Sequence, residues 1–233
     1  MSENVVVTDI VRADPEIARA LAEFGSATVH EAMGRIGYAG PAIRPIQQGA
    51  SVSGTAITVS AAPGDNLMVH VAIEQSQDGD VIVVVPTTDS AFGFIGELMA
   101  TQMQVRGVQA YVTSGGVRDT DELRRMGFPV WTAHVSAQGT VKDTAGAVNV
   151  PVVLGGAIVR AGDVVVADDD GVAIVPRERA AETLEAARAR AAREAANRLR
   201  YQDGEISMDL NGLRPVVEGL GIRYMTQAEY DAR

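Results

Sequence analysis

The residue types best suited to chemistry gather in one stretch, GELMATQMQVRGVQAYVTSGGVRDTDEL, residues 96–123. Glu97 is followed after twenty residues by Arg118 and Asp119, and Glu122 stands three positions later. The planar guanidinium of Arg118 suits a small carboxylate, and Asp119 offers a hard oxygen ligand to a divalent cation such as Mg²⁺. Glu122 lies one helical turn beyond Asp119 and is expected to share its face of a helix.

The elements around these residues are expected to bring them together. A helix predicted over about 94–106 places Glu97 near its start, where backbone N–H groups point outward and favour an anion. A strand predicted over 110–114 ends just before a glycine pair at 115–116, where α/β folds usually bind ligands. Two glycines allow close backbone approach or a positive φ. Spacing alone leaves an alternative about equally open, in which the Arg-Asp step is a surface ion pair and the glutamates are helix-start acids.

Other chemistry-bearing side chains carry weaker signals. Three histidines are scattered without HxxH or HExxH spacing, so a satisfied structural role is predicted for each: His30, His70 and His134. The run Asp168–Asp170 precedes a glycine and is predicted to be a solvated turn. Lys142 is the only lysine and is predicted to lie in a loop. Since residues 96–123 contain no lysine, a Schiff-base mechanism has no candidate there.

The remaining pattern predicts an α/β fold. Asp14 and Pro15 are suited to the N-cap and first turn of a helix that reaches about Phe24. Further helices are predicted from about 26, over 67–75, with Asp65 or Asn66 as the cap, and over 118–126. Strands are predicted over 50–61, 78–86 and 110–114 and in the runs PVWTA, VPVVL, DVVVAD and GVAIVP, with a hairpin turn at Asp170-Gly171.

Two parts of the chain differ in composition. Residues 1–177 are predicted to form one α/β catalytic domain, and residues 178–233 a helical extension that packs on the same or a neighbouring subunit. Residues 178–203 are rich in Ala, Glu and Arg and predict one long helix. Its apolar face is mostly alanine, with Leu184 and Leu199 as larger anchors, so it needs a packing partner for stability.

The amino-acid composition and the net charge argue against several classes of protein. The chain has 233 residues, of which 46% are hydrophobic and 21% charged, an ordinary globular composition. A formal net charge of −10 argues against binding to nucleic acid or to an anionic membrane. The absence of cysteine excludes disulfides and cysteine-based zinc sites. Neither a signal-peptide pattern nor a bilayer-length apolar run is visible, so a cytoplasmic location is expected.

The spacing from Glu97 through Arg118-Asp119 to Glu122 resembles the signature of a known enzyme family. These are the class II pyruvate aldolases that cleave 4-hydroxy-4-methyl-2-oxoglutarate and 4-carboxy-4-hydroxy-2-oxoadipate, in the superfamily of the regulator of ribonuclease activity A. The likeness covers nearly the whole chain, including ATVHEAMGRIG, APGDNLMVHVAIEQ, GDVIVVVPTT and GDVVVADDDGVAIVP. Several relatives carry Asp where this chain has Glu97, a change that keeps the charge but lengthens the side chain.

The resemblance implies a fold, an assembly and a cofactor. The fold would be a layered α/β/β/α domain of the swivelling phosphohistidine-like type with a long C-terminal helix. Homotrimers or homohexamers would form, with the sites between subunits. Mg²⁺ or Mn²⁺ would be bound directly by Asp119, with Glu97 and Glu122 as further acids of the metal site, either in direct contact or through water.

The resemblance also implies residues that bind the 2-keto acid substrate. Arg118 would contact the pyruvyl oxygens, and the turn at Gly96 with the backbone N–H groups of Leu98 and Met99 would hold the carboxylate. Glu194, on the C-terminal helix of a neighbouring subunit, would complete the site.

The implied reaction is a retro-aldol cleavage to pyruvate plus a second keto acid, with oxaloacetate decarboxylation as a secondary activity through the same enolate. A metal would polarise the keto acid, and Arg118 would add fixed positive charge near the enolate oxygen. Water on the metal, oriented by Glu97 and Glu194, is the candidate for proton transfer. The alternative is a non-catalytic regulator that binds and inhibits an endoribonuclease, which would not need this set of residues. A methyltransferase has little support, because no GxGxxG loop follows a strand.

Overall fold

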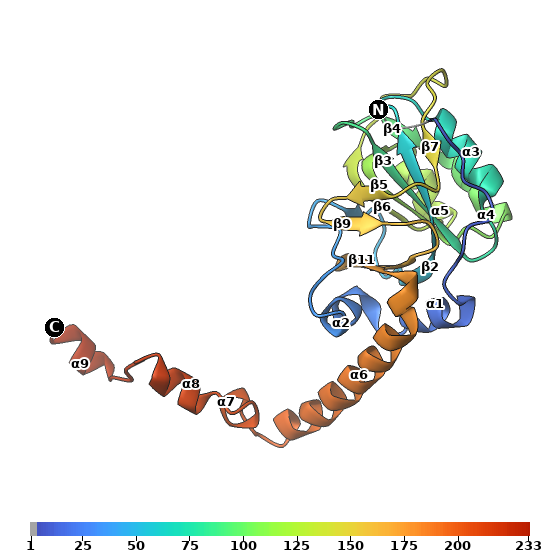
Figure 1. The fold of residues 1–233 in the computed structure, drawn as a ribbon. Helices are drawn as coiled ribbons and strands as arrows, with labels where there is room; N and C mark the ends of the chain where they lie inside the picture. Colours follow the sequence, from blue (N-terminus) through green and yellow to red (C-terminus); the bar gives the residue numbers. More distant parts are fainter. Residues whose placement is uncertain (1–3) are drawn as a thin grey trace. The chain divides into compact units, whose positions relative to one another are not determined.

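The computed structural model describes residues 4–233 and divides into two compact units. The first unit ends at Arg188 and the second spans Ala189–Arg233. Figure 1 follows the chain through both units by colour. The predicted mixed α/β fold and the long helix of the C-terminal region are both present, since the first unit contains both strands and helices and α6 (Ala180–Gln202) has 23 residues.

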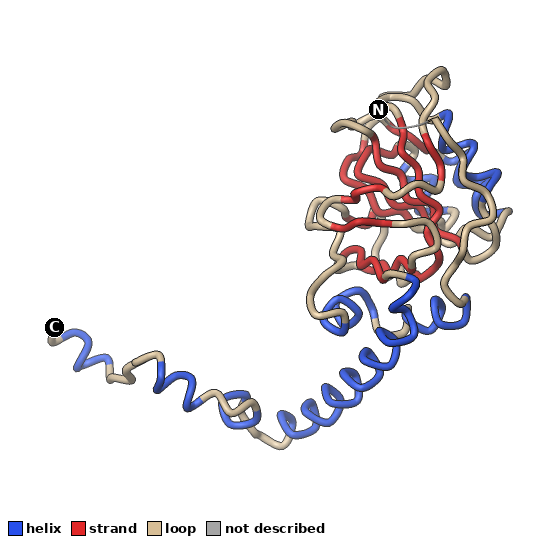
Figure 2. The backbone as a smooth tube through the Cα atoms, in the orientation of Figure 1, coloured by secondary structure: helices blue, strands red, loops and turns tan. Residues whose placement is uncertain are grey.

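A mixed β-sheet forms the centre of the first unit, as the red segments of Figure 2 show. Its strand order is β1-β6-β5-β3-β2-β10-β11, with β4 beside β5 and β7 beside β2. Strands β2, β3, β5 and β6 run parallel, while β1 and β10 join antiparallel at the two sides. The bounds are β1 Arg44–Pro45, β2 Val52–Ala61, β3 Asp80–Pro86, β4 Gly93–Ile95, β5 Ala110–Val117, β6 Val130–Val135, β7 Ala147–Val148, β10 Val164–Asp168 and β11 Gly171–Val175.

Alternate side chains of the central strands pack on opposite faces of this sheet. In β3, Ile82 and Val84 join a core with the helices, while Val81 and Val83 join a core with the small β8–β9 hairpin. This period of two explains why DVIVVVP is apolar throughout, because both faces of the strand are covered. The hairpin consists of β8 (Val152–Leu154) and β9 (Ala157–Val159).

Helices surround the sheet in two groups. Helices α3, α4 and α5 contribute to the larger core on one face of β2, β3 and β5. Helices α1 and α2 and the beginning of α6 pack with β10 and β11 in a third cluster. The bounds in the first unit are α1 Pro15–Leu21, α2 Gly25–Ala32, α3 Leu67–Gln75, α4 Glu97–Val105, α5 Thr120–Arg125 and the 3₁₀ turn η1 Arg177–Arg179.

Several local predictions are confirmed. Asp14 caps α1 by accepting from the Glu16 amide at 2.8 Å, and Pro15 stands at the first helical position. The Asp170-Gly171 turn joins β10 to β11 as an antiparallel hairpin, with Asp168 opposite Gly171. These features depend on neighbouring residues alone, which is why the sequence predicts them.

Two predictions next to the candidate residues are wrong. The helix expected from Phe94 begins only at Glu97, because Gly93–Ile95 forms the buried strand β4 parallel to β5. The strand expected to end at Ser114 continues to Val117, because β4 and β6 both pair with its last residues. The glycine pair 115–116 is therefore part of β5, and neither glycine has a positive φ. The predicted close approach is confirmed, since a Cβ on Gly116 would lie 2.4 Å from the Ala91 carbonyl oxygen.

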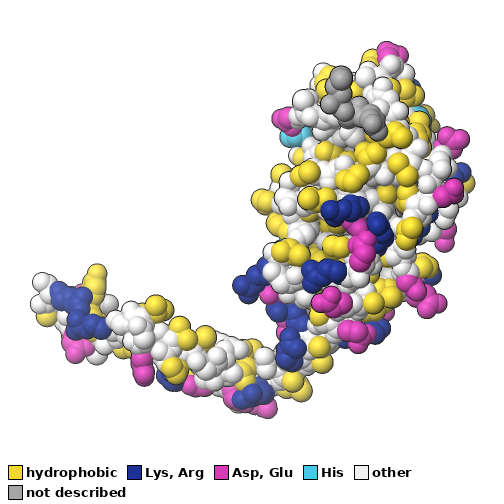
Figure 3. Space-filling model, in the orientation of Figure 1, with side chains coloured by type: hydrophobic (Ala, Val, Ile, Leu, Met, Phe, Trp, Pro, Cys, Tyr) yellow, Lys and Arg dark blue, Asp and Glu magenta, His cyan; other side chains and the backbone are white. Residues whose placement is uncertain are grey.

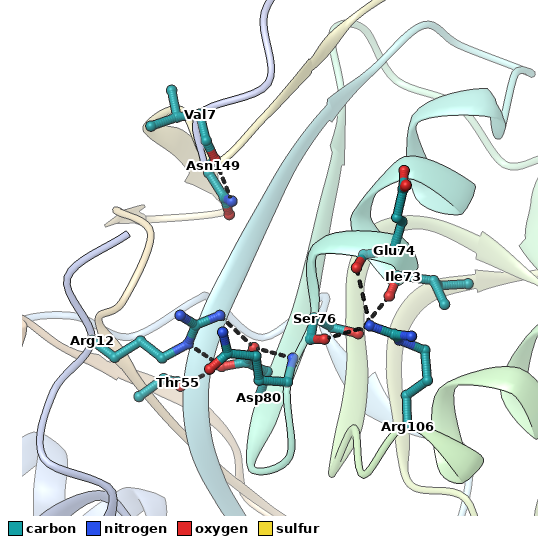
Figure 4. Close-up of polar contacts among 10 residues, drawn as sticks. Val7, Arg12, Thr55, Ile73, Glu74, Ser76, Asp80, Arg106 and Asn149 are labelled. Carbon is teal, nitrogen blue, oxygen red and sulfur yellow. Dashed lines mark hydrogen bonds and ion pairs between the residues drawn. The ribbon is translucent and has the colours of Figure 1, made fainter. Parts of the chain in front are cut away.

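A buried ion pair fixes the beginning of the sheet (Figure 4). Asp80 opens β3 and is fully buried, and its carboxylate accepts from Arg12 Nε and Nη2, each at 2.9 Å. Thr55 Oγ1 and the Gln77 amide also donate to it. Because every described partner is a donor, the burial of this carboxylate is compensated.

The second unit has no buried core of its own. No residue of Ala189–Arg233 is buried, although large apolar side chains are spaced along α6 and the shorter helices that follow. These helices are α7 (Ser207–Leu210), α8 (Arg214–Gly219) and α9 (Gln227–Asp231). Of the two predicted anchors of the long helix, Leu184 is buried in the first unit, whereas Leu199 is 63% exposed.

Figure 3 shows acidic and basic side chains interspersed among apolar ones. On this face, the basic side chains of the described residues do not form one extended patch. None of the helices within residues 4–233 is both long and apolar enough to cross a membrane.

Candidate functional site

A cavity of about 230 Å³ lies where the parallel strands end. Gly96 follows β4, Arg118 follows β5, and Asn66 lies beyond β2 at the start of α3. Parallel strands present their carboxyl ends at one edge of the sheet, which is where open α/β folds bind ligands. The lining residues are Asn66, His70, Gly93, Phe94, Ile95, Gly96, Leu98, Met99, Arg118, Asp119, Thr140 and Lys142.

Arg118 and Asp119 occupy the turn between β5 and α5. The Arg118 amide donates to the Ile95 carbonyl at 3.0 Å, which ties this turn to the end of β4. Asp119 has φ 55° and ψ 39°, a left-handed conformation that few non-glycine residues adopt. Its Oδ2 accepts from the Glu97 amide at 3.1 Å, and Arg118 Nε lies 3.9 Å from the same oxygen. The surface ion pair is thus a loose contact, and the carboxylate is oriented by a backbone amide instead.

Gly96 permits this arrangement. It is the N-cap of α4 and has extended backbone, so its conformation is open to any residue. A Cβ at this position would lie 2.1 Å from Asp119 Oδ2 and 3.2 Å from Arg118 Cγ. The glycine is therefore needed for space, and its absence of a side chain lets the carboxylate reach the start of the helix.

The N-terminus of α4 supplies backbone donors to the cavity. The first N–H groups of a helix have no acceptor within the helix and favour an anion. That of Glu97 binds Asp119, and the next two residues, Leu98 and Met99, line the cavity. A carboxylate placed between Arg118 and this helix start would meet a guanidinium and outward-pointing amides together.

Asp65 holds the remaining wall of the cavity in place. Its Oδ1 accepts from the Leu67 amide at 2.8 Å at the start of α3, which agrees with the predicted cap. Its Oδ2 accepts from the amides of Asp143 and Thr144, each at 2.7 Å, and so fixes the loop that carries Lys142. Burial opposes ionisation, but the three amides together outweigh it and hold the pKa of Asp65 below its usual 3.8.

The lining residues that were not predicted as functional include His70, Asn66 and Lys142. His70 Nε2 is buried without a hydrogen-bond partner among the described residues, so the prediction of a satisfied histidine is wrong at this position. Burial lowers the pKa of His70, and the positive charge of Lys142 lowers it further. Asn66 donates through Nδ2 to the Phe94 carbonyl at 2.8 Å, while its Oδ1 is likewise buried and unpartnered there. Lys142 lies in a loop as predicted, on the rim of the cavity.

The spacing of Asn66 and His70 in the sequence indicates that both can contribute to one site. They stand four apart at the beginning of one helix, so both side chains face the same way. That helix follows a strand end just as the Arg118 turn does.

The other histidines and the acidic run have local structural contacts. His30 Nδ1 lies 3.0 Å from the Ile36 carbonyl, and His134 Nε2 lies 3.6 Å from Asp89. Asp168 accepts from the Ser26 amide at 2.7 Å and from its hydroxyl at 2.6 Å, at the beginning of α2. Asp169 and Asp170 form an exposed turn as predicted, whereas Asp168 is the last residue of β10 and is half-buried and paired rather than solvated.

The three glutamates predicted for the site do not line the cavity together with Asp119. The side chains of Glu97 and Glu122 are exposed and are absent from the cavity lining. Glu194 belongs to the second unit, where it pairs with Arg190 at 2.8 Å. Within the residues that the structure describes, no three histidine or acidic side chains are grouped as a metal site. Metal and catalytic roles for these glutamates stay predictions.

The donor set at Asp119 is nevertheless compatible with a hard divalent cation. One carboxylate oxygen is held by the Glu97 amide, and the side chain is 40% exposed, so the carboxylate is accessible to a cation. Mg²⁺ is usually bound through one or two carboxylates, with water and substrate oxygens completing its octahedron. Asp119 with a chelating 2-keto acid would meet that requirement.

A larger hollow, about 440 Å³, lies beside Arg12 and Gln77 at the opposite ends of the strands. The Arg12 guanidinium is already paired with Asp80, as Figure 4 shows, and so is not available to a ligand. The smaller cavity, with its unpartnered polar atoms, is the better candidate.

The sequence that forms this mixed α/β unit and its Arg-Asp turn matches a known family over most of its length. Residues 26–174 match the RraA-like family model, described as Aldolase/RraA. The chain belongs to this family.

Individual relatives are similar to the chain over most of its length. A protein of Halalkalibacterium halodurans, provisionally named 4-hydroxy-4-methyl-2-oxoglutarate aldolase, is 30% identical over 166 residues, which cover 71% of this chain and 79% of that protein. The crystal structure of RraAS2 from Streptomyces coelicolor, described as an unusual member of the RNase ES inhibitor RraA protein family, has TM-score 0.71 and 30% identity. It covers 81% of this chain and 100% of its own. An uncharacterised protein of Pseudomonas syringae shares the fold, with TM-score 0.73, 24% identity and coverage of 84% and 97%.

Proposed function

We propose that this protein is a divalent-metal-dependent pyruvate aldolase. It cleaves 4-hydroxy-4-methyl-2-oxoglutarate, 4-carboxy-4-hydroxy-2-oxoadipate or both to pyruvate and a second keto acid, and it decarboxylates oxaloacetate more slowly. The observation that carries the proposal is the cavity in which Arg118, Asp119 and the start of α4 converge. The family and the aldolase name of a relative that matches most of the chain support the same reaction.

The chain's own residues account for binding of the pyruvyl half. Arg118 contacts the substrate carboxylate and the C2 oxygen, and the amides of Leu98 and Met99 donate to the carboxylate. Asp119 would hold Mg²⁺ or Mn²⁺, which supplies Lewis acidity toward the 2-keto acid. The Glu97 amide keeps the Asp119 carboxylate in one orientation, so the binding groups are set before the substrate arrives.

Cleavage of the C3–C4 bond leaves negative charge on the pyruvyl C2 oxygen as the C4 hydroxyl becomes a carbonyl. The fixed charge of Arg118 stabilises that oxygen more in the transition state than in the substrate. Glu97 and Glu194, the latter from a neighbouring subunit of a homo-oligomer, orient the water that removes the hydroxyl proton. The same enolate forms when oxaloacetate loses carbon dioxide, which is why both activities are assigned to one site.

The test is pyruvate release coupled to lactate dehydrogenase, with each of the three substrates, in Mg²⁺ or Mn²⁺ and again with a chelator. We expect metal-dependent release that is faster with the 4-hydroxy-2-keto acids than with oxaloacetate. Absence of release with every substrate and metal, together with co-purification of an endoribonuclease, would instead favour a regulator of the kind named for the Streptomyces relative.

A further inference from the structure

A third hollow, of about 370 Å³, lies between the segment that precedes α1 and the turns that follow β7, β9 and β11. It shares no lining residue with the cavity at Arg118, so the proposed aldolase chemistry gives it no role. Its volume is near the lower limit of the range of about 300–1,000 Å³ that is usual for small-molecule sites, which suits a small metabolite.

Asn149 presents a buried acceptor to this hollow. The residue is 7% exposed, and its Nδ2 donates to the Val7 carbonyl at 2.8 Å, as Figure 4 shows. That bond fixes the side-chain amide, whose Oδ1 is buried without a hydrogen-bond partner among residues 4–233. Because buried polar atoms are rarely left unpaired, this oxygen marks a position where a donor from a ligand is expected.

Two residues that line the hollow have a backbone conformation that is uncommon outside glycine. Asp9 has φ 53° and Asn149 has φ 62°. Only four non-glycine residues within 4–233 have a positive φ, and another of the four is Asp119 in the candidate catalytic turn. Such conformations cost free energy and cluster at ligand sites, so their occurrence together here is a second observation that favours binding.

Opposite charges line the hollow without pairing with each other. Asp9 and Arg160 are both exposed, and the side chain of neither makes an ion pair or a hydrogen bond within residues 4–233. The buried carboxylate of Asp163 holds the backbone here, since it accepts from the amides of Arg160 at 2.8 Å and Arg177 at 3.1 Å. A ligand with one positive and one negative group would complement both free charges at once.

We propose that this hollow binds an α-amino acid with an apolar side chain. The ammonium group donates to the Asp9 carboxylate and to Asn149 Oδ1, and the carboxylate contacts the Arg160 guanidinium. The side chain of the ligand lies against Val7 and Val11, which line the hollow and are 42% and 71% exposed. This binding is independent of the proposed aldolase function.

Calorimetric titration of the full chain with L-leucine, L-leucinamide and 4-methylpentanoate tests the proposal. The amide lacks the carboxylate and 4-methylpentanoate lacks the ammonium group, whereas all three share the apolar part. Each ligand is measured on wild-type protein, Arg160→Met and Asp9→Asn. Asparagine tolerates the left-handed conformation of Asp9, so this variant removes the charge and keeps the backbone.

Two control variants locate the binding. Arg35→Met removes a positive charge from a side chain that is 75% exposed and does not line the hollow. Arg118→Ala removes the guanidinium of the candidate catalytic cavity, which also attracts carboxylates.

We expect L-leucine to bind wild-type protein at one site per chain, and the two modified ligands to bind about tenfold more weakly. Arg160→Met and Asp9→Asn should each weaken L-leucine binding by about threefold to tenfold, because each removes one charged contact. The two control variants should bind L-leucine as wild-type protein does.

The proposal is overturned if wild-type protein does not bind L-leucine, or if either modified ligand binds as tightly as L-leucine. It is also overturned if Arg160→Met or Asp9→Asn binds as wild type, or if Arg35→Met weakens binding as much as they do. Loss of binding in Arg118→Ala would assign the signal to the catalytic cavity and would equally refute the proposal. Because none of these measurements depends on pyruvate release, failure here leaves the proposed function to its own test.

Discussion

Gly96→Ala tests whether the Asp119 carboxylate must occupy the position seen here. The backbone of Gly96 is extended, so alanine fits its conformation without strain. The new Cβ would lie 2.1 Å from Asp119 Oδ2, and real Cβ contacts are essentially never under 3.0 Å. The carboxylate must therefore move by about 0.9 Å, which breaks its 3.1 Å contact with the Glu97 amide.

The expected effect on catalysis is large and that on folding is small. A displacement of about 1 Å at a reacting centre can cost about a hundredfold, or about 2.7 kcal/mol of transition-state stabilisation. Loss of the amide contact costs about 1 kcal/mol of folding stability, since the carboxylate is partly exposed. Replacing glycine with alanine also stabilises the folded protein by about 0.4–1 kcal/mol, because it lowers the conformational entropy of the unfolded chain. The net change in unfolding free energy is then within about 1 kcal/mol.

The assay is pyruvate release at saturating Mg²⁺ or Mn²⁺, together with urea unfolding. Gly139→Ala is the matched control, because the same change places a Cβ 3.4 Å from Arg118 Nη1, an ordinary contact. We expect kcat/KM about a hundredfold lower for Gly96→Ala and nearly unchanged for the control. A Gly96→Ala protein within threefold of wild type, by this assay, would refute the positioning argument.

Three further changes test other parts of the structure. Asp119→Ala should abolish both cleavage and decarboxylation and should weaken Mn²⁺ binding. Arg118→Ala should reduce turnover while Mn²⁺ remains bound. Equal Mn²⁺ affinity in the two variants would contradict these roles. Arg12→Met should lower the unfolding free energy by about 3–5 kcal/mol, because it leaves the Asp80 carboxylate buried and without its cation. Asp65→Asn should be less stable than wild type at neutral pH. The pKa of Asp65 in the folded protein lies below 3.8, its value in the unfolded chain. The difference in unfolding free energy between wild type and Asp65→Asn is therefore largest above pH 3.8 and shrinks as the pH falls through the folded-state pKa. Urea unfolding measured from about pH 7 to pH 3 would reveal this decrease.

The local part of the fold could be predicted from the sequence, whereas the pairing of distant segments could not. Asp14 with Pro15, and Asp170 with Gly171, act within a few residues and give a cap and a hairpin as expected. Gly93–Ile95 is too short to show a strand periodicity of its own. It becomes β4 only because the end of β5 lies beside it.

The candidate site was only partly predictable for the same reason. The Arg118-Asp119 turn could be identified because its residue types are informative and adjacent. The spacing of His70 from Asn66 places it on the same side of α3, but only the folded chain shows that its Nε2 is buried without a partner among the described residues. Glu97 contacts Asp119 through its backbone N–H, which every residue except proline would supply at that position.

Exchange of the methyl protons of pyruvate in D₂O, followed by NMR, tests the central claim most directly. Enolate formation is the step assigned to the Arg118-Asp119 cavity, and this exchange reports it without a second substrate. We predict exchange by the Mg²⁺- or Mn²⁺-loaded wild-type protein, its loss with chelator, and its absence in Asp119→Ala. No exchange by the loaded wild-type protein, or equal exchange by Asp119→Ala, would contradict the assignment.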